Sequence, residues 1–426
     1  MPRLPNFLSP GRLVAAWDRL RESFWFLPAL MAAGAIALSF GLTSLDAVVD
    51  DRTYRRHDWI YLFGPEGARA ILSAIASSMI TVAGLTFSIT MLTLQLASSQ
   101  FGPRLLRNFL RDRGNQLVLG TFIATFVYCL LVLRTVKGVE GSSFVPHISV
   151  AVGILLSIAS LAVLIYFIHH TAHSIRVETI LASLAAETGA AIERLFPEKV
   201  GREVPAEREP DRSMAPVDAA TARLIRPERS GYVQMVDGDA LINRAVELGI
   251  VVHLAVGPGA FVTPDDVLMS AAPGARIDAA SAAGLRAALV IGAERTPNQD
   301  LAFSIRRIVE IAQRALSPSV NDPTTAIYCI DRLGEALARL AERKMPEAHR
   351  LDPEGHLRIV VQPVSFATLA HDSFSAVARY GMADADVVRA LLRMLDRLAD
   401  GIPTAERGVL AGLAEVIRRE AAPRPL

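Results

Sequence analysis

Four long apolar segments dominate the first part of the chain. Each has the roughly 20 apolar residues that a helix needs to cross a hydrocarbon layer about 30 Å thick. Lipid offers the backbone no hydrogen-bond partners, so each segment is predicted to be a helix that satisfies its own amides and carbonyls. The pattern predicts a transmembrane domain of four helices over residues 1–174, with the lipid bilayer as a partner. The four segments run approximately over residues 23–45, 70–98, 116–136 and 146–169.

The pattern changes after residue 174. Apolar residues keep a helical spacing as far as Phe196, and a charged segment with several prolines and few large apolar residues follows. Residues 175–219 are therefore predicted to form a stalk helix and a linker. Over residues 220–426, strand-like segments and amphipathic helical segments both occur. They predict a C-terminal α+β domain in which helices predominate.

Arginines near the ends of the spans indicate an orientation, because short loops rich in lysine and arginine tend to stay in the cytoplasm. The N-terminal tail is one such segment. The loop between the second and third spans is another, with Arg104, Arg107, Arg111 and Arg113. The loop between the first two spans also carries arginines, but they are spread among acidic residues. The bias predicts that the N-terminus and, after four spans, the C-terminal domain are cytoplasmic.

The second apolar segment is unusual because it carries many hydroxyl and amide side chains. Polar groups cost free energy when they face lipid, so their face is predicted to point toward protein or water. Two interpretations stay open: hydrogen bonds between helices, or a polar path that water can reach. No Asp, Glu, Lys or Arg lies in the middle of any span, which argues against an active pump and leaves a passive pore. The polar side chains near one helical face are Ser77, Thr81, Ser88, Gln95 and Ser99.

Two segments of the C-terminal domain have the pattern of helix starts. In RTPNQD, residues 295–300, Thr296 is predicted to be an N-cap and Pro297 the first helical residue. In SPSVNDPTTA, Asp322 is predicted to cap a helix that begins at Pro323. Capping explains both segments structurally. The functional alternative is an anion-binding helix N-terminus formed with the participation of Thr296, Asn321 and Asp322.

Charge, cysteines and motifs narrow the choice of function. A formal net charge of +1 gives no basic excess for nucleic acid. Cys129 and Cys329 lie far apart, which excludes a disulfide framework and a cysteine-based zinc site. His169 and His173 have a metal-ligand spacing, but no third ligand lies nearby. No nucleophile elbow, zinc-protease helix or Walker loop occurs, so we expect no enzymatic activity, catalytic residue, metal or cofactor.

Three separated segments resemble one bacterial family of predicted multi-pass membrane proteins that has no assigned function. They are FSITMLTLQLASSQFGPRLLRNFLRDRGNQLVLGTFIATFVYCLLVL, then RTPNQD, then RALSPSVNDPTTA, and they occur in the family's order. The resemblance implies a protein of the bacterial inner membrane with a C-terminal cytoplasmic domain. The family brings no catalytic residues that could be carried over.

Two functions are compatible with these patterns. The first is an oligomeric pore or channel-like transport protein for a small ion or other ligand, lined by the polar face of the second helix and gated by the cytoplasmic domain. The second is a regulatory module in which the four helices anchor and oligomerise a domain that binds a ligand or partner. Both predict a homo-oligomer.

Overall fold

The computed structural model describes residues 24–48, 64–101, 112–139, 142–174, 176–196, 221–362, 364–402 and 404–421. The chain divides into two compact units, Met1–Arg176 and Val177–Leu426, which are described separately. The predicted linker over residues 197–219 and the arginines 104, 107 and 111 lie outside the described residues.

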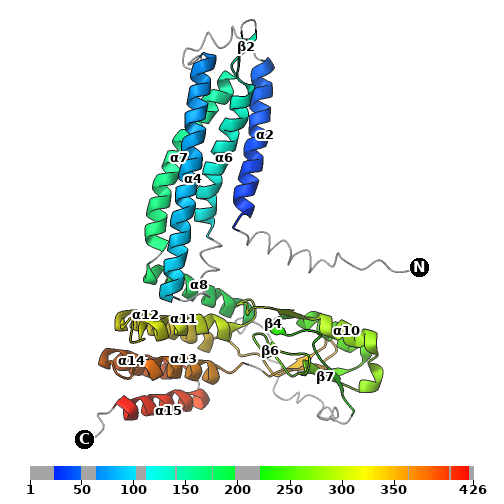
Figure 1. Cartoon of the computed structure of the whole chain (residues 1–426). Coiled ribbons are helices and arrows are strands. Elements are labelled where there is room, and N and C mark those ends of the chain that lie inside the picture. Colours follow the sequence, from blue (N-terminus) through cyan, green and yellow to red (C-terminus); the bar gives the residue numbers. More distant parts are fainter. Residues whose placement is uncertain are drawn as a thin grey trace. The chain divides into compact units, whose positions relative to one another are not determined.

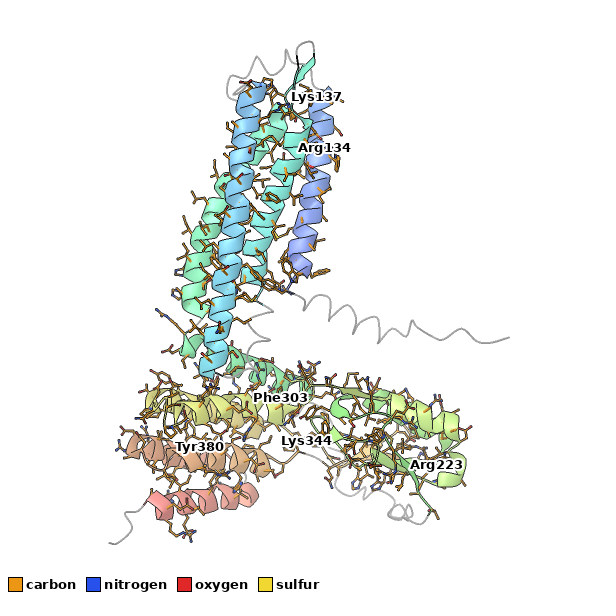
Figure 2. The ribbon with its side chains drawn as sticks, viewed as in Figure 1. Arg134, Lys137, Arg223, Phe303, Lys344 and Tyr380 are labelled. Atoms are coloured by element: carbon orange, nitrogen blue, oxygen red, sulfur yellow. The ribbon has the colours of Figure 1, made fainter. Side chains whose placement is uncertain are left out.

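The first unit is a bundle of helices that alternate in direction (Figure 1). Four of them are long and apolar enough to cross a membrane, which confirms the predicted class. A short hairpin of β1 (Lys137–Val139) and β2 (Ser142–Phe144) links the last two. Arg134 and Lys137 lie at that end of the bundle (Figure 2). The helices are α2 (Phe26–Val48), α4 (Pro65–Phe101), α6 (Arg113–Thr135) and α7 (His147–Ser174).

Helix α6 is the centre of this bundle and packs against α2, α4 and α7. Gly120 allows the close approach of α2, because a Cβ atom there would lie 2.5 Å from Sδ of Met31 and 3.2 Å from Cα of Pro28. On the other side, Gly153 of α7 packs against both Leu72 and Cys129. Small residues thus set the helix spacing, as is common where lipid gives helices no hydrophobic reason to associate.

A buried carboxylate joins the ends of α2 and α7. Asp46 is 3% exposed and accepts hydrogen bonds from the backbone N–H groups of Ile148 (3.0 Å) and Ser149 (2.9 Å) and from the Ser149 hydroxyl (2.6 Å). The first N–H groups of a helix have no partner within the helix, so Asp46 supplies the cap that the start of α7 needs. We call this end of the bundle the Asp46 end.

The second unit combines a helical part and a β part. Helix α8 packs against α11 and α12, and its buried side chains include Ile180, Leu184 and Ile192. The segment predicted as a stalk is therefore an integral helix of the C-terminal unit, because its apolar face is covered there. The helices of this part are α8 (Val177–Leu195), α11 (Leu301–Ala315), α12 (Pro323–Ala341), α13 (Phe366–Gly381), α14 (Ala385–Gly401) and α15 (Thr404–Ala421).

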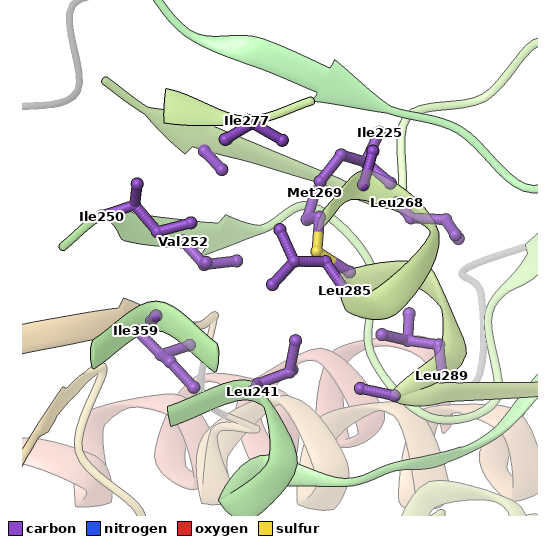
Figure 3. Close-up of a cluster of buried hydrophobic side chains, with 14 of the residues drawn as sticks. Ile225, Leu241, Ile250, Val252, Leu268, Met269, Ile277, Leu285, Leu289 and Ile359 are labelled. Atoms are coloured by element: carbon purple, nitrogen blue, oxygen red, sulfur yellow. The ribbon is translucent and has the colours of Figure 1, made fainter. Parts of the chain in front are cut away.

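The β part holds two sheets and the helices α9 (Gly238–Leu248) and α10 (Ala279–Ala287). Strand β10 pairs in parallel with β5, although about 100 residues separate them, and the other pairs are antiparallel. Side chains from both sheets and both helices form one apolar core (Figure 3). The five-stranded sheet has the strand order β3 (Arg223–Ile225), β7 (Met269–Ala272), β5 (Val251–Leu254), β10 (Leu357–Val360) and β9 (His349–Leu351). The three-stranded sheet has the order β6 (Phe261–Val262), β4 (Gly231–Val236) and β8 (Leu289–Gly292).

Candidate functional site

The predicted polar face of α4 lies on the outside of the bundle. Ser77, Thr81, Ser88, Gln95 and Ser99 are all exposed, whereas the inward face of α4 carries small and apolar residues such as Ala76, Met79 and Ala83. The structure therefore brings the predicted residues onto one face, as the helical spacing requires. Within the described residues of this chain, no other helix covers that face.

Contacts between the helices show which residues of α4, α6 and α7 lie at the same level along the bundle. Leu72, Cys129 and Gly153 lie at one level, and Asp112 and His170 contact each other about 17 residues farther along α6 and α7. The same count along α4 reaches Ile89. The Asp46 contact lies about four residues to the other side, so the levels of Asp46 and Asp112 are about 21 residues, or about 31 Å, apart. That distance matches the hydrocarbon thickness of about 30 Å.

By this count, Ser77, Thr81 and Ser88 lie between the levels of Asp46 and Asp112, whereas Gln95 and Ser99 lie beyond the level of Asp112. The Thr81 hydroxyl donates to the carbonyl of Ser77 (2.8 Å), and the Ser88 hydroxyl donates to the carbonyl of Gly84 (2.9 Å). Bonds to the helix's own carbonyls lower the cost of exposing hydroxyls to lipid.

The outward face of α4 nevertheless differs from the outward face of α7. Its centre is small and hydroxylated, and a Cβ atom added at Gly84 would meet nothing within 4 Å. Larger residues, Ile80, Leu85 and Phe87, lie at its edges. The outward face of α7, by contrast, is built from large apolar side chains: Leu155, Ile158, Leu161, Ile165 and Ile168.

The interior of the described bundle contains buried polar groups and an apolar cluster. Midway between the Asp46 and Asp112 levels, the hydroxyls of Thr125 and Ser160 contact each other at 3.1 Å, and both side chains are buried. Phe122 and Phe167 belong to an apolar cluster that also holds Met79, Ala83, Val118 and Leu119. This cluster lies between the Thr125 pair and Asp112 along α6.

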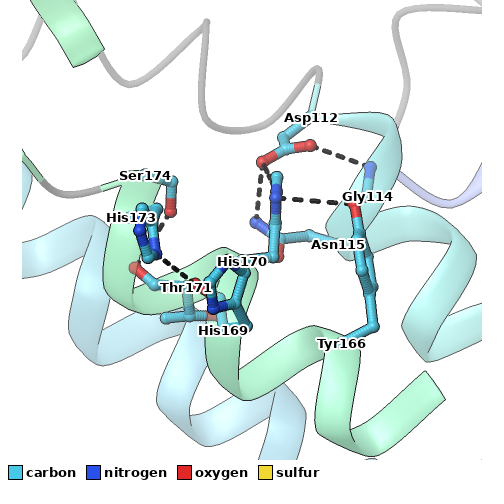
Figure 4. Close-up of polar contacts among 9 residues, drawn as sticks. All are labelled: Asp112, Gly114, Asn115, Tyr166, His169, His170, Thr171, His173 and Ser174. Carbon is cyan, nitrogen blue, oxygen red and sulfur yellow. Dashed lines mark hydrogen bonds and ion pairs between the residues drawn. The ribbon is translucent and has the colours of Figure 1, made fainter. Parts of the chain in front are cut away.

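A polar cluster joins α6 and α7 at the opposite end, which we call the Asp112 end (Figure 4). Oδ2 of Asp112 lies 2.6 Å from Nε2 of His170, and Oδ1 accepts from the N–H of Gly114 at 2.8 Å as the N-cap of α6. The ring of Tyr166 stacks on that of His170 at 5.3 Å between centroids. The sequence analysis missed this cluster, although the histidine pair at 169–170 and the cap-like Asp112 were visible in the sequence.

The neighbouring His169 and His173, which have a metal-ligand spacing in the sequence, lie side by side on α7. Their rings lie 4.1 Å apart, but Nδ1 of His173 contacts the backbone carbonyl of His169 at 3.0 Å. Among the described residues, the one group with a ligand-like spacing is Asp352, Glu354 and His356. Asp352 is already engaged by Arg358, whose Nε donates to its Oδ2 at 2.7 Å. The pKa of Asp352 is lowered, because burial, which opposes ionisation, is outweighed by Arg358 and the N–H of His356.

In RTPNQD, the helix begins later than predicted. Asp300 is the N-cap of α11, and its Oδ1 accepts from the N–H of Phe303 at 2.9 Å. Thr296 is therefore not the cap; its hydroxyl lies 3.5 Å from the carbonyl of Gln234. Gln299 pairs with the backbone of Val236, accepting from its N–H (2.8 Å) and donating to its carbonyl (3.1 Å). These bonds to β4 hold residues before Asp300 out of the helix.

Asp300 is also the centre of a junction between the two parts of the C-terminal unit. It is 4% exposed and forms an ion pair with Arg295 (2.7 Å), whose guanidinium lies over the ring of Phe303. Burial raises the pKa of Asp300, although Arg295 and the Phe303 N–H favour its charged form. Gly259 packs directly against this ion pair. Arg194 of α8 donates to the carbonyl of Asn298 at 2.8 Å, which attaches α8 to the same segment.

Asp322 and Pro323 begin α12 as predicted. Asp322 accepts from the N–H (3.0 Å) and hydroxyl (2.6 Å) of Thr325. Asn321 is exposed and adopts φ 48°, a left-handed conformation that Asn tolerates better than most residues. Because the carboxylate of Asp322 occupies the helix N-terminus, its negative charge disfavours a bound anion there.

Comparison with known proteins decides the family. The family model described as "Predicted membrane protein (DUF2254)" matches residues 21–397. The chain belongs to the DUF2254 family. The match includes α4, the Asp112 end and both capping segments, so each feature above lies within the region that defines the DUF2254 family.

Similar DUF2254-type chains occur in mycobacteria. Uncharacterized proteins of Mycobacterium bovis and Mycobacterium tuberculosis are each 36% identical to this chain over 417 residues. The alignments cover 96% of this chain and 78% of each mycobacterial protein. No solved structure matches this DUF2254 chain. The comparisons support a multi-pass membrane protein, and the activity has to be argued from the geometry.

Proposed function

We propose that this DUF2254 protein is an oligomeric, channel-like protein whose copies meet along the outward face of α4. The observation that supports this most is the contrast between the outward faces of α4 and α7. At hydrocarbon depth, α4 presents Ser77, Thr81, Gly84 and Ser88, whereas α7 presents large apolar side chains. Small residues favour close helix contacts in lipid, and hydroxyls favour contact with protein or water.

The packing of a single chain supports a shared path over an internal one. Phe122 and Phe167 belong to the apolar cluster inside the described bundle, which interrupts the polar groups there. A polar path is therefore best formed between copies, with α4 from each copy facing a common axis. A small ion or small polar solute is the class of permeant that such a hydroxyl-lined path would fit, because no charged residue lies on α4 from Ala70 to Phe101.

The number of copies decides whether the α4 faces cover each other or enclose a path. In a twofold dimer, the two α4 faces would cover each other and leave no path. In a closed ring of more copies, the same faces would surround the axis. The proposal therefore requires more than two copies.

The C-terminal unit is proposed to act as the gate. Only Ile175 and Arg176 separate α7 from α8, and α8 packs against α11 and α12. A movement of this unit would therefore pull directly on the end of α7. The orientation follows from the arginine bias, which supports a cytoplasmic Asp112 end. An exposed Glu178→Cys thiol should then react with a membrane-impermeant reagent from the cytoplasmic side only.

The alternative is a membrane-anchored regulatory module without transport. It is favoured by the hydroxyls of Thr81 and Ser88, which are already bonded to backbone carbonyls. In that case α4 would serve only for assembly. Neither proposal assigns an enzymatic activity, metal or cofactor to the chain.

Flux through purified protein in liposomes tests the proposal. Ser88→Leu should abolish flux of small ions, because it narrows the proposed path along the common axis and removes a hydroxyl that lines it. The matched control is Ile158→Leu on the outward face of α7, which should leave flux unchanged. Assembly of both variants is measured by light scattering. No flux from assembled wild-type protein under varied ions, voltage and tension would favour the regulatory module.

A further inference from the structure

We propose that a small monovalent cation, Na⁺, binds inside the helix bundle near the Asp112 end, between α4, α6 and α7. Two buried oxygens there, Oδ1 of Asn115 and Oγ1 of Thr171, have no hydrogen-bond partner among the described residues. Asn115 is only 8% exposed, and Figure 4 shows both side chains at this end of α6 and α7. An unpaired buried polar atom costs free energy, so such atoms indicate a bound water or ion.

The three helices change from apolar to polar side chains at the same level of the bundle. Ala83 of α4, Leu119 of α6 and Phe167 of α7 belong to one apolar cluster. About one helical turn nearer the Asp112 end, each of these helices carries a polar side chain: Thr86, Asn115 and Thr171. Residues three or four apart share a helical face, so these polar side chains face the same interior region as the cluster.

Asn115 and Thr171 lean toward each other from adjacent turns. Counting from the contact between Asp112 and His170, Thr171 lies about one turn nearer the Asp112 end than Asn115. Side chains lean toward the N-terminus of their own helix, and α6 and α7 run in opposite directions, so each of the two leans toward the level of the other. Nδ2 of Asn115 faces Oδ2 of Asp112 at 3.5 Å, which leaves Oδ1 on the other side of the amide. The two unpartnered oxygens can thus serve one ligand.

The neighbouring hydroxyl oxygens of α4 are acceptors too. The buried Thr86 hydroxyl donates to the carbonyl of Ala83 (2.9 Å), and the Thr90 hydroxyl donates to the carbonyl of Thr86 (2.8 Å). Their hydrogens are used within α4, which leaves oxygen lone pairs for a ligand. Hard cations bind oxygen, but Ca²⁺ and Mg²⁺ sites take carboxylates as ligands. Neutral oxygens therefore favour a monovalent cation, and the close packing around the two unpartnered oxygens favours Na⁺ over the larger K⁺.

A buried cation needs a counter-charge, and Asp112 supplies it. Asp112 adjoins Asn115, whereas the acidic residues of α2 and α4 lie toward the opposite end and α6 and α7 contain none. Oδ2 of Asp112 also contacts Nε2 of His170 at 2.6 Å. Arg113 is exposed on α6, so its charge is hydrated.

The site differs in place and consequence from the proposed path. It lies on the inward face of α4, so it does not depend on copies that meet along the outward face. Thr171 is three residues before the end of α7 at Ser174, and α8 begins at Val177. Bound Na⁺ therefore holds α7 against α4 and α6 at the end from which the C-terminal unit continues.

Thermal unfolding of the full-length protein in detergent tests the proposal in NaCl, KCl or choline chloride of equal ionic strength. A ligand that binds only the folded protein raises the unfolding midpoint. The wild-type midpoint should be about 2–5 °C higher in NaCl than in choline chloride, and higher in NaCl than in KCl. Equal midpoints in the three salts would overturn the proposal and leave water as the occupant. A midpoint that is highest in KCl would overturn the assignment to Na⁺.

Two variants and a matched control place the effect at this site. Asn115→Leu and Thr171→Val should lose most of the rise in NaCl, and the nearly isosteric Thr171→Val serves if Asn115→Leu does not fold. Thr125→Val is the control, because it removes a buried hydroxyl from the pair with Ser160 on the other side of the apolar cluster. It should keep the rise even if it is less stable. An equal rise in Thr171→Val and Thr125→Val would contradict the site.

Discussion

Gly259 and the carboxylate of Asp300 occupy adjoining positions that leave no room for a side chain at residue 259. The turn that contains Gly259 lies between β5 and β6 in the β part of the C-terminal unit, and Asp300 caps α11 of the helical part. The backbone at Gly259 has φ 89°, which few residues other than glycine adopt. This contact therefore depends on both the conformation and the size of one residue.

Gly259→Ala should lower the free energy of unfolding of the C-terminal unit by about 1–3 kcal/mol, because it adds backbone strain and displaces Asp300. Gly257→Ala is the matched control in the same turn, since a Cβ atom there meets nothing within 4 Å and φ is not positive. It should change the unfolding free energy by less than about 1 kcal/mol. Denaturant unfolding of both variants, followed by far-ultraviolet circular dichroism, compares the two losses. Equal losses of unfolding free energy in the two variants would show that the Gly259–Asp300 contact does not contribute to stability.

Asp300→Ala should destabilise the junction by about 2–4 kcal/mol, because it removes the cap of α11 and leaves Arg295 unpaired. The pKa of Asp300 is raised in the folded protein, mainly by burial. Its contribution to stability is therefore greatest at low pH and falls as pH rises from the unfolded value of about 3.9 through the raised value.

Asp300→Asn, which keeps a capping side chain, should remove that fall from the stability profile above about pH 4. Thermal unfolding measured in steps of pH gives the profile. A fall of unchanged size in Asp300→Asn would assign it to another group.

Gly120→Ala should destabilise the helix bundle by about 1–3 kcal/mol, because its methyl group would overlap Met31 and press against the backbone of Pro28. Gly84→Ala is the control, because a methyl group there meets nothing in the same chain. Detergent unfolding of each variant as a monomer measures both effects. A bundle that tolerates both changes equally would mean that α2 and α6 can separate at little cost.

Much of the fold could be predicted because its signals are local. Hydropathy and length located four spans, and Asp322 followed by Pro323 indicated the start of α12. The predicted N-cap at Thr296 was wrong because of a tertiary contact. Gln299 is hydrogen-bonded to the backbone of Val236 in β4, so the helix begins only after Asp300. No local pattern could signal that contact.

The site residues that were missed depend on contacts between distant parts of the chain. Asp112 and His170 are 58 residues apart and meet only because α6 and α7 are antiparallel neighbours. The parallel pairing of β5 and β10 is of the same kind, since it joins segments on either side of α11 and α12. The hydroxyl face of α4, by contrast, followed from helical periodicity, and its outward direction needed the packing of the other helices.

Disulfide cross-linking in native membranes tests most directly whether copies meet along the outward face of α4. Cys129 and Cys329 are buried, so a new cysteine on the surface is the reactive one among the described residues. Ser77→Cys and Ser88→Cys should each give covalent dimers on mild oxidation, whereas Ile158→Cys on α7 should not. Each cross-linked variant should also assemble into more than two copies. Cross-links at Ile158→Cys with none at the two α4 positions would contradict the account.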